Sequence, residues 1–319
     1  MDQKLKEFYK AVSENNEKKV KLLIRKISTS FFDKRNPFIE AIESTKMEVF
    51  KILYEVFPGY ITYKDQREIY PFEKALQTGN FEAAKFIFNN TKESSNEMAN
   101  QLLNAAIIKN DTETIEFIIP RADVNYALKD QQTPLHVAAI SNNVSAINIL
   151  IAKRAWANSC NKYGDSPLHT AIRCDNNLAA KTMIKILSKT PEIINQPNAN
   201  YDRPLHLAIT RENIEIIEKL LKYGANIDCE NNDKETPKSL ARYSNNTKIE
   251  KLFTSYAKKQ KWKVWFQSFF PGKANKTGST EKPIDKLPRC NSLTKMTDKN
   301  NNSKDKFVPR PRFRTDLHN

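Results

Sequence analysis

One pair of residue types recurs along most of this 319-residue chain: an alanine, and an asparagine five residues after it. The pair returns at intervals of 30 to 37 residues, and one lysine, Lys46, interrupts the asparagine series. The alanines are Ala11, Ala41, Ala75, Ala105, Ala138, Ala171, Ala208 and Ala241, and the residues five further on are Asn16, Lys46, Asn80, Asn110, Asn143, Asn176, Asn213 and Asn246. A period of about 33 residues is typical of stacked repeats, so the chain is predicted to form a solenoid rather than a globule.

Other positions keep the same register. A large apolar residue stands three residues before seven of the alanines, and another stands twelve residues after all eight. Proline stands four residues before six of them, where it suits the first position of a helix. Alanine allows two helices to approach closely, and asparagine tolerates the left-handed conformation and caps helices. Each unit is therefore predicted to be a pair of short helices that buries its apolar face only against neighbouring units.

Four stretches carry a family resemblance: TPLHVAA (133–139), SPLHTAI (166–172), RPLHLAI (203–209) and TPKSLA (236–241). Together with RADVN (121–125) and YGANID (223–228), they resemble the ankyrin repeat. The resemblance covers residues 100–256. Residues 1–99 keep only the register, and they are interpreted as degenerate N-terminal ankyrin-like repeats or as helical hairpins that stack similarly. The predicted fold is thus all-α: an ankyrin-repeat solenoid of stacked helix-turn-helix units with β-turn fingers, about eight units as counted from the alanines.

Positive charge is concentrated at the C-terminal end. Residues 257–319 hold 16 Lys or Arg against 5 Asp or Glu, whereas residues 1–256 hold 36 against 32. From residue 272 the chain is polar and poor in aliphatic residues, so it cannot bury enough surface to offset the entropy of ordering. Residues 272–319 are therefore predicted to be a disordered basic tail.

Residues 257–271 join the repeats to the tail and are predicted to form an aromatic and basic helix. The apolar residues Trp262, Trp265, Phe266, Phe269 and Phe270 follow helical spacing and share one face. One interpretation is that this helix extends the last repeat and folds back to cap the stack, because solenoids need caps. Alternatives are an anchor in a membrane surface, with segment 258–270 meeting anionic lipid, or a helix that binds a partner.

No catalytic constellation is visible, so the chain is predicted not to be an enzyme and to need no cofactor or metal. His136, His169 and His206 recur at one repeat position, which a structural role demands. In the resembled family this His and the hydroxyl before it tie turn to helix; Thr133 and Ser166 fit that pattern, and Arg203 departs from it. The cysteines Cys160, Cys174, Cys229 and Cys290 form no CxxC pair, and they are interpreted as reduced thiols. An enzyme hidden in residues 1–99 is a third class of function, with no motif in its favour.

No apolar run approaches the roughly 20 residues of a membrane helix, and the first residues lack the apolar core of a signal peptide. A cytoplasmic location is therefore expected. The Lys- and Asn-rich, Gly-poor composition suggests an AT-rich genome. A short ankyrin protein with a polar C-terminal tail resembles the effectors that intracellular bacteria export into host cells, and it also resembles ankyrin proteins of protists and ordinary eukaryotic adaptors. Export into a host cell is accordingly a hypothesis, with a signal expected in the tail.

In ankyrin-like arrays, the fingers and adjoining first helices form a concave face that binds partners. Aromatic and arginine side chains dominate binding energies at interfaces. On this basis the predicted partner-binding residues are Tyr126, Lys129, Trp156, Tyr163, Tyr201, Arg203 and Arg211. The favoured function is a protein-protein interaction scaffold, expected to be a monomer, whose partner is a protein of unknown identity. The alternative is a membrane- or nucleic-acid-associated adaptor that uses the C-terminal segment, with nucleic acid disfavoured because no base-reading motif is visible.

Overall fold

The structure is a computed structural model that describes residues 3–32, 34–43, 47–91 and 95–269. The side chains of Phe31, Lys129 and residues 262–269 are outside this description. All of the described residues belong to one packed unit, Met1–Ala274. The predicted tail, 272–319, lies outside the described residues.

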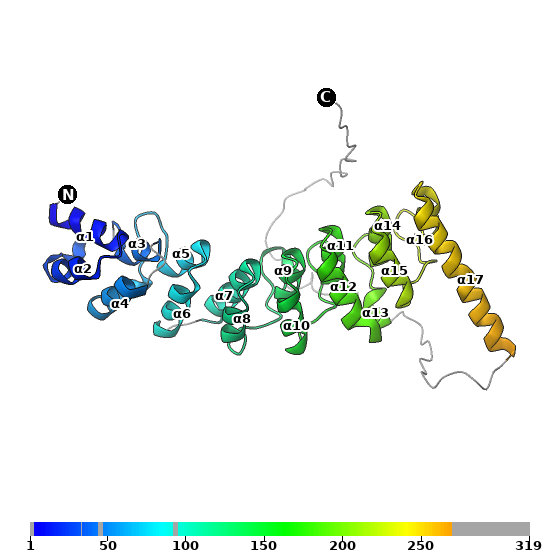
Figure 1. The fold of residues 1–319 in the computed structure, drawn as a ribbon, viewed down its shortest axis with the longest axis horizontal. Helices are drawn as coiled ribbons and strands as arrows, with labels where there is room; N and C mark the ends of the chain where they lie inside the picture. The colour runs from blue at the N-terminus through cyan, green and yellow to red at the C-terminus, as the bar shows by residue number, and fades with distance from the viewer. Residues whose placement is uncertain (1–2, 33, 44–46, 92–94, 270–319) are drawn as a thin grey trace, which may run out of the picture. The chain divides into compact units, whose positions relative to one another are not determined.

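Pairs of short helices follow one another along the chain (Figure 1), and the described residues contain no strand. The pairs are α1 (Gln3–Ser13) with α2 (Glu17–Leu23), α3 (Pro37–Glu43) with α4 (Met47–Val56), α5 (Pro71–Thr78) with α6 (Phe81–Asn90), α7 (Asn96–Lys109) with α8 (Thr112–Ile118), α9 (Pro134–Ile140) with α10 (Val144–Ala152), α11 (Pro167–Arg173) with α12 (Asn177–Ile186), α14 (Pro204–Thr210) with α15 (Ile214–Lys222), and α16 (Pro237–Tyr243) with α17 (Thr247–Phe269). The connections contain η1 (Ile24–Lys26), η2 (Thr29–Phe31), η3 (Pro58–Thr62), η4 (Lys129–Gln131), η5 (Leu187–Lys189) and the short helix α13 (Pro191–Ile194). The predicted all-α fold of about eight helix pairs is confirmed.

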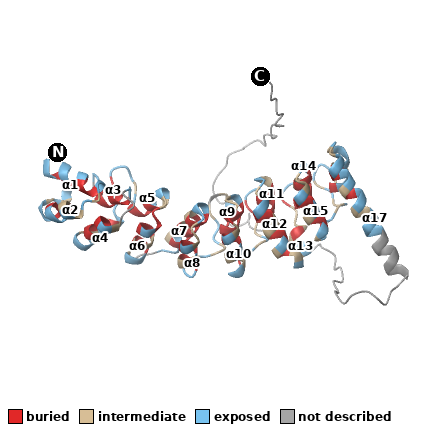
Figure 2. Ribbon diagram, viewed as in Figure 1, coloured by how far each residue is buried: buried red, intermediate tan, exposed pale blue. Residues whose placement is uncertain are grey.

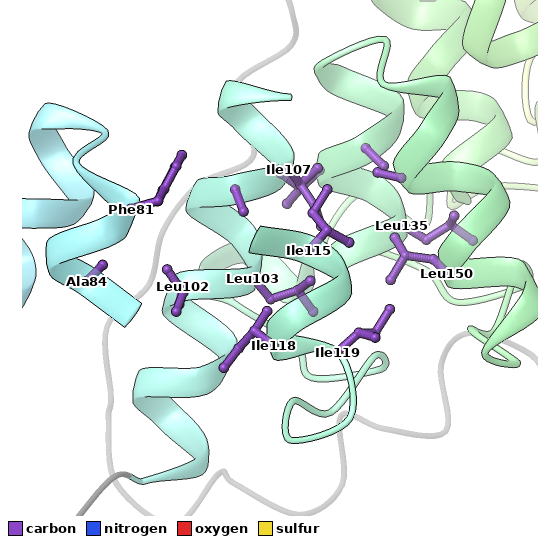
Figure 3. Packing of buried hydrophobic residues seen from close by; sticks show 14 of the residues in the cluster. Phe81, Ala84, Leu102, Leu103, Ile107, Ile115, Ile118, Ile119, Leu135 and Leu150 are labelled. Atoms are coloured by element: carbon purple, nitrogen blue, oxygen red, sulfur yellow. The ribbon is translucent and has the colours of Figure 1, made fainter. Parts of the chain in front are cut away.

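Each first helix packs against its own partner and against the first helix of the next pair, from α1 and α3 through to α14 and α16. The buried side chains form one cluster that runs from Leu5 to Phe253. Buried residues face the neighbouring helices and exposed residues face outward (Figure 2). Figure 3 shows this layer around α7 and α8, where Leu103, Ile115 and Ile118 lie together. The stacking predicted from the repeat period is confirmed.

The recurring asparagine has two hydrogen-bonding duties that explain its period. Its side-chain oxygen caps the second helix of its own pair, as Asn80 Oδ1 does for the Ala83 N–H at 3.1 Å. Its side-chain N–H group also donates to a carbonyl of the preceding pair, from Asn80 to Ile42 at 3.0 Å and from Asn143 to Ile107 at 3.0 Å. The left-handed turn position is the residue before it, such as Gly79 or Asn142. At Asn80 and Asn143 one side chain thus caps its own pair and links it to the preceding one.

The fourth pair departs by one residue from the predicted register. In other pairs the asparagine N–H donates to the carbonyl of the repeat alanine, as from Asn143 to Ala138. In the fourth pair the same bond joins Asp111 to Ala106, and Asp111 caps α8. The predicted pair Ala105 and Asn110 is therefore wrong by one position, because an aspartate supplies the cap that was expected from an asparagine.

The last helix, α17, runs without interruption from Thr247 to Phe269. Residues 257–269 therefore continue the second helix of the last pair. The described side chains from Lys258 to Lys261 are exposed, and α17 packs against α15 and α16. The capping role of the aromatic face stays a prediction, because the side chains of Trp262, Trp265, Phe266 and Phe269 and all of Phe270 lie outside the description.

Candidate partner-binding surface

The three repeated histidines are held by structural hydrogen bonds. The N–H of Thr133 donates to His136 Nδ1 at 3.2 Å, so His136 carries its proton on Nε2 and donates to the carbonyl of Asp165 at 2.9 Å. His169 makes the same pair of bonds with Ser166 and with the carbonyl of Asp202. Burial lowers the pKa of both histidines to about 4, so both are neutral at pH 7. The predicted structural role of Thr133–His136 and Ser166–His169 is confirmed.

The third histidine keeps this role without a hydroxyl. The backbone N–H of Arg203 donates to His206 Nδ1 at 3.0 Å, and His206 Nε2 reaches the carbonyls of Cys229 and Glu235 at 3.1 and 3.2 Å. With arginine in place of a hydroxyl residue at position 203, the side-chain hydrogen bond to the histidine Nδ1 is missing. The bonds from His206 Nε2 to the next pair remain.

A buried aspartate joins two neighbouring fingers. Arg173 donates to Asp165 through two nitrogens, at 2.8 and 3.0 Å, and the side chain of Asn198 donates to it at 2.8 Å. Burial alone would raise the pKa of Asp165, but the hydrogen bonds from Arg173 and Asn198 hold it below its usual value. The Asp165–Arg173 ion pair therefore has a structural role at the base of the fingers.

The finger tips are held rigidly by bonds from finger to finger. The amide of Lys162 donates to the carbonyl of Asp130 at 2.9 Å, and that of Ala199 donates to the carbonyl of Tyr163 at 3.3 Å. Within its tip, Asn161 accepts from the N–H groups of Tyr163 and Asp165, at 2.9 and 3.1 Å. Gly164 allows this close contact between fingers. Its φ is +71°, and a Cβ there would lie only 2.4 Å from the nitrogen of Ala199. The tips are thus pre-ordered, which lowers the entropic cost of binding.

Four of the predicted binding residues place aromatic rings in the finger segments. Trp156 is 63% exposed, Tyr201 52%, Tyr163 48% and Tyr126 38%. We refer to Tyr126, Trp156, Tyr163 and Tyr201 together as the finger face. Part-exposed rings in these segments have the composition of an interface hot spot.

The fold does not require the ring at Trp156. The N–H groups of Asp123, Trp156 and Asn226, which occupy equivalent positions, each donate to an asparagine side-chain oxygen at 2.8 Å. The backbone bond is the same with three different side chains. The exposed indole is therefore free for another use.

Tyr201 adds a second argument of this kind. Its φ is +59°, a left-handed conformation that the preceding finger gives to Gly164. A bulky residue in this region carries strain of about 1 kcal/mol. The equivalent tip positions of other fingers hold Glu68, Gln131 and Lys234, also at positive φ, so this conformation is general to the fingers and does not require the ring of Tyr201.

The predicted cationic residues lie in different settings. Arg211 is exposed, with Nη1 3.5 Å from Asp175. Arg203 is partly buried, and Lys129 lies in η4 with its side chain outside the description. Lys162 pairs with Asp130 at 2.8 Å and lies 5.0 Å from the ring of Tyr163. The rim of the finger face is thus mixed in charge.

Sequence reasoning missed two rings on an earlier connection. Tyr63 is 57% exposed and Tyr70 is 41% exposed, in the segment between α4 and α5. Asp65 holds this tip by accepting from the N–H groups of Arg67 and Ile69, at 2.8 and 3.3 Å. The aspartate stands where a later finger has Asn161, ten residues before the repeat alanine, and this register could have revealed it.

Other kinds of site were sought in the described part of the chain. No group of three or more His, Cys, Asp or Glu there is placed to hold a metal ion. Among the described helices, none is long and apolar enough to cross a membrane. Cys174 and Cys229 are free thiols, as predicted, and Cys160 Sγ accepts from the side chain of Gln196 at 3.1 Å. Cys290 lies outside the described residues.

Comparison with known proteins gives a consistent pattern. Residues 102–192 match the family description "Ankyrin repeats (3 copies)", and residues 200–232 match "Ankyrin repeat". A putative ankyrin repeat protein of fowlpox virus is 28% identical over 166 residues, which are 49% of this chain and 48% of that protein. The phosphocholine transferase AnkX of Legionella pneumophila is 31% identical over 118 residues, 36% of this chain and 12% of the transferase. The tyrosine-protein kinase Shark of Drosophila melanogaster is 28% identical over 160 residues, 49% of this chain and 16% of the kinase. The chain spans less than half the length of each of these relatives.

Proposed function

Residues 102–192 and 200–232 of this chain are ankyrin repeats, and on that premise we propose that the chain is a non-catalytic scaffold that binds a partner protein. The finger face, together with the concave side of the adjoining first helices, is the proposed contact surface, and the chain acts as a monomer. The observation that carries this proposal is the exposed Trp156, in a finger segment whose backbone bond at this position does not depend on its side chain.

A non-catalytic role is supported by the state of the ionisable groups. The histidines use both ring nitrogens in hydrogen bonds, and burial lowers their pKa values. Asp165 is paired with Arg173. These groups have no free atom to offer as an acid, base or nucleophile.

The test compares the intact chain with a variant carrying Trp156→Ala, Tyr163→Ala and Tyr201→Ala. Partners are captured by affinity purification, and the dissociation constant of each recovered partner is then measured by calorimetry. We expect the three changes to weaken binding by about 100-fold or more, because hot-spot rings each contribute upwards of about 1 kcal/mol.

The matched control carries Leu178→Ala and Val56→Ala, which remove exposed apolar side chains from the second helices α12 and α4. This control should bind as the intact chain does. A partner that binds the three-alanine variant and the intact chain equally well contradicts the finger-face proposal.

We also propose that the protein works in the cytoplasm, of a host cell if it is an exported bacterial effector. The support is its composition and its basic tail, with a relative in Legionella pneumophila whose likeness covers 12% of that protein. A translocation assay compares the full chain with a chain that ends at residue 271. Equal export of the two would contradict a signal in the tail.

A further inference from the structure

The net positive charge of the repeat array lies at its beginning. Residues 1–35 hold ten Lys or Arg against five Asp or Glu, whereas residues 36–256 hold 26 against 27. The rest of the array is therefore close to neutral. A local excess of this kind attracts anionic partners, while the same charge spread evenly would serve only solubility.

These charges gather on one side of a helical stretch. Helix α2 and the turn η1 continue into each other, since Leu23 and Ile24 both keep right-handed helical backbone angles. Val20, Leu23 and Ile24 are buried on the inner side. The exposed residues are Lys18, Lys21, Leu22, Arg25 and Lys26, at the i, i+3, i+4, i+7 and i+8 spacing of one helix face. We call these five residues the basic stripe.

The charges of the basic stripe are mostly uncompensated. Lys21 lies 3.7 Å from Glu17, and both side chains are well exposed, so this pair is weak and screened by salt. Across the described ranges, no carboxylate pairs with Lys18, Arg25 or Lys26. Four cations thus face solvent within about two turns of helix.

A leucine lies among these cations. Leu22 is 64% exposed, and Lys18, Lys21, Arg25 and Lys26 surround it on the same face. A single exposed leucine is ordinary. With four cations around it, the pattern matches a surface that binds the headgroups of anionic lipids while an apolar side chain enters the acyl boundary.

Nucleic acid fits the stripe less well. Proteins that hold single strands stack bases on exposed aromatic rings, and the described rings of this first pair, Phe8 and Tyr9, are both buried. The leucine would gain nothing from a phosphate backbone. An acidic polypeptide would likewise leave Leu22 in water.

We propose that the basic stripe docks the protein onto an anionic lipid bilayer. Lys18, Lys21, Arg25 and Lys26 contact phosphate and carboxylate headgroups, and Leu22 inserts below them. The stripe lies on a second helix and the turn after it, whereas the finger face lies on the loops before later first helices. Because different elements form the two surfaces, lipid and protein partner can be bound together.

The test uses the full chain and vesicles that contain about 30% phosphatidylserine, against vesicles of phosphatidylcholine alone. Partition coefficients are measured by sedimentation in about 0.1 M salt. A variant with Lys18→Gln, Lys21→Gln, Arg25→Gln and Lys26→Gln should partition at least about tenfold more weakly into the anionic vesicles, because each cation near an anionic surface contributes about 1 kcal/mol. Leu22→Ser should weaken partition by about threefold, with little dependence on salt.

The matched control carries Lys153→Gln, Lys222→Gln, Lys234→Gln and Lys238→Gln, which are exposed and lower the net charge by the same amount. It should stay within about twofold of the intact chain. The C-terminal residues 257–319 are identical in all variants and add the same background. These changes lie on the surface, and circular dichroism confirms that each variant is folded.

Three results would overturn the proposal. One is no preference of the intact chain for anionic vesicles, and another is equal partition of the stripe variant and the control. The third is a stripe variant that binds vesicles as the intact chain does but has lost binding to a polyglutamate peptide or to duplex DNA. That result would assign the stripe to an acidic polypeptide or to nucleic acid.

Discussion

The first three helix pairs and the five that follow bury the same layer with different side chains. In residues 3–91 the layer includes rings that contact one another among its aliphatic side chains: Phe50 lies 5.0 Å from Phe38 and 5.6 Å from Phe86, measured between ring centroids. From residue 95 to 256 it is built mainly from leucine, isoleucine and alanine. Large rings fill the space that the later pairs fill with several small aliphatic groups.

The bond that links one pair to the next shows the same contrast. His136 Nε2 donates to the carbonyl of Asp165, and in the first pair the hydroxyl of Tyr9 donates to the carbonyl of Arg35. Tyr9 and His136 both stand two residues before the repeat alanine, and both accepting carbonyls stand six residues before the next one. In the second and third pairs this place holds Ile39 and Glu73, so the stack does not depend on such a donor in every pair. The family pattern first matches at residue 102, although the helix pairs begin at residue 3.

The largest expected effect concerns the rings. Phe50→Ala should lower the free energy of unfolding by about 4 kcal/mol, because it removes a fully buried ring that contacts two others. Leu150→Ala, at a fully buried position of a later pair, should cost about 3 kcal/mol. Urea titration of both variants measures the difference. A clearly smaller loss for Phe50→Ala would mean that the first region is loosely packed.

Acid should separate the two regions. Burial lowers the pKa of His136 and His169 to about 4, against about 6.5 in an unfolded chain, so their stabilisation is complete above pH 6.5 and is lost as the pH falls to about 4. The loss is at most about 3 kcal/mol for each histidine. Burial raises the pKa of Tyr9, which stays neutral throughout this range.

Hydrogen exchange at pH 7 and at about pH 4.5 tests this prediction, with the pH dependence of the chemical exchange rate removed. Amides of α9 and α11 should lose protection, and those of α3 and α4 should change less. An equal loss of amide protection in the two regions would show that protonation of the histidines is not the cause.

A smaller effect is expected from the single hydroxyl of Tyr9. Tyr9→Phe keeps the ring and its contact with the Arg35 guanidinium, 4.6 Å from the ring centroid, but leaves the carbonyl of Arg35 without its donor. The free energy of unfolding should fall by about 1 to 2 kcal/mol. Tyr126→Phe, at an exposed position, is the control and should be neutral within about 0.5 kcal/mol. No loss in Tyr9→Phe would show that the first link is dispensable.

The smallest predicted change is a gain in stability. Tyr201→Gly should stabilise the fold by about 0.5 kcal/mol, because glycine relieves the left-handed strain, and it should weaken partner binding. Tyr126→Gly, where no positive φ is relieved, should destabilise the fold by about the same amount. Thermal melts of the two variants give the signs directly. A loss of stability in Tyr201→Gly would indicate that the ring serves folding.

The fold was largely predictable because the asparagine and alanine act through local and repeated bonds. The exception at the fourth pair arose since aspartate caps a helix as well as asparagine does, so Asp111 and Ala106 took the roles assigned to Asn110 and Ala105. The link through Tyr9 was not predicted, because a tyrosine in an apolar helix is read as core.

The binding surface was predictable only in part. The sequence places Trp156 and Tyr201 on fingers, but neither the strain at Tyr201 nor the freedom of the Trp156 side chain can be read from it. The basic stripe was missed since its five residues mix a leucine with cations. That pattern becomes visible once Val20, Leu23 and Ile24 are known to face inward.

The most direct test of the central claim, that both regions form one stack through equivalent bonds, is hydrogen exchange at the amides that close each turn. These amides donate to the repeat alanine: Asn16 to Ala11 at 2.8 Å, Asn80 to Ala75 at 3.0 Å, Asn143 to Ala138 at 3.0 Å and Asn176 to Ala171 at 2.9 Å. At pH 7 all four should be protected well above the rates of an unfolded peptide. Protection of Asn143 and Asn176 with free exchange at Asn16 and Asn80 would contradict the account.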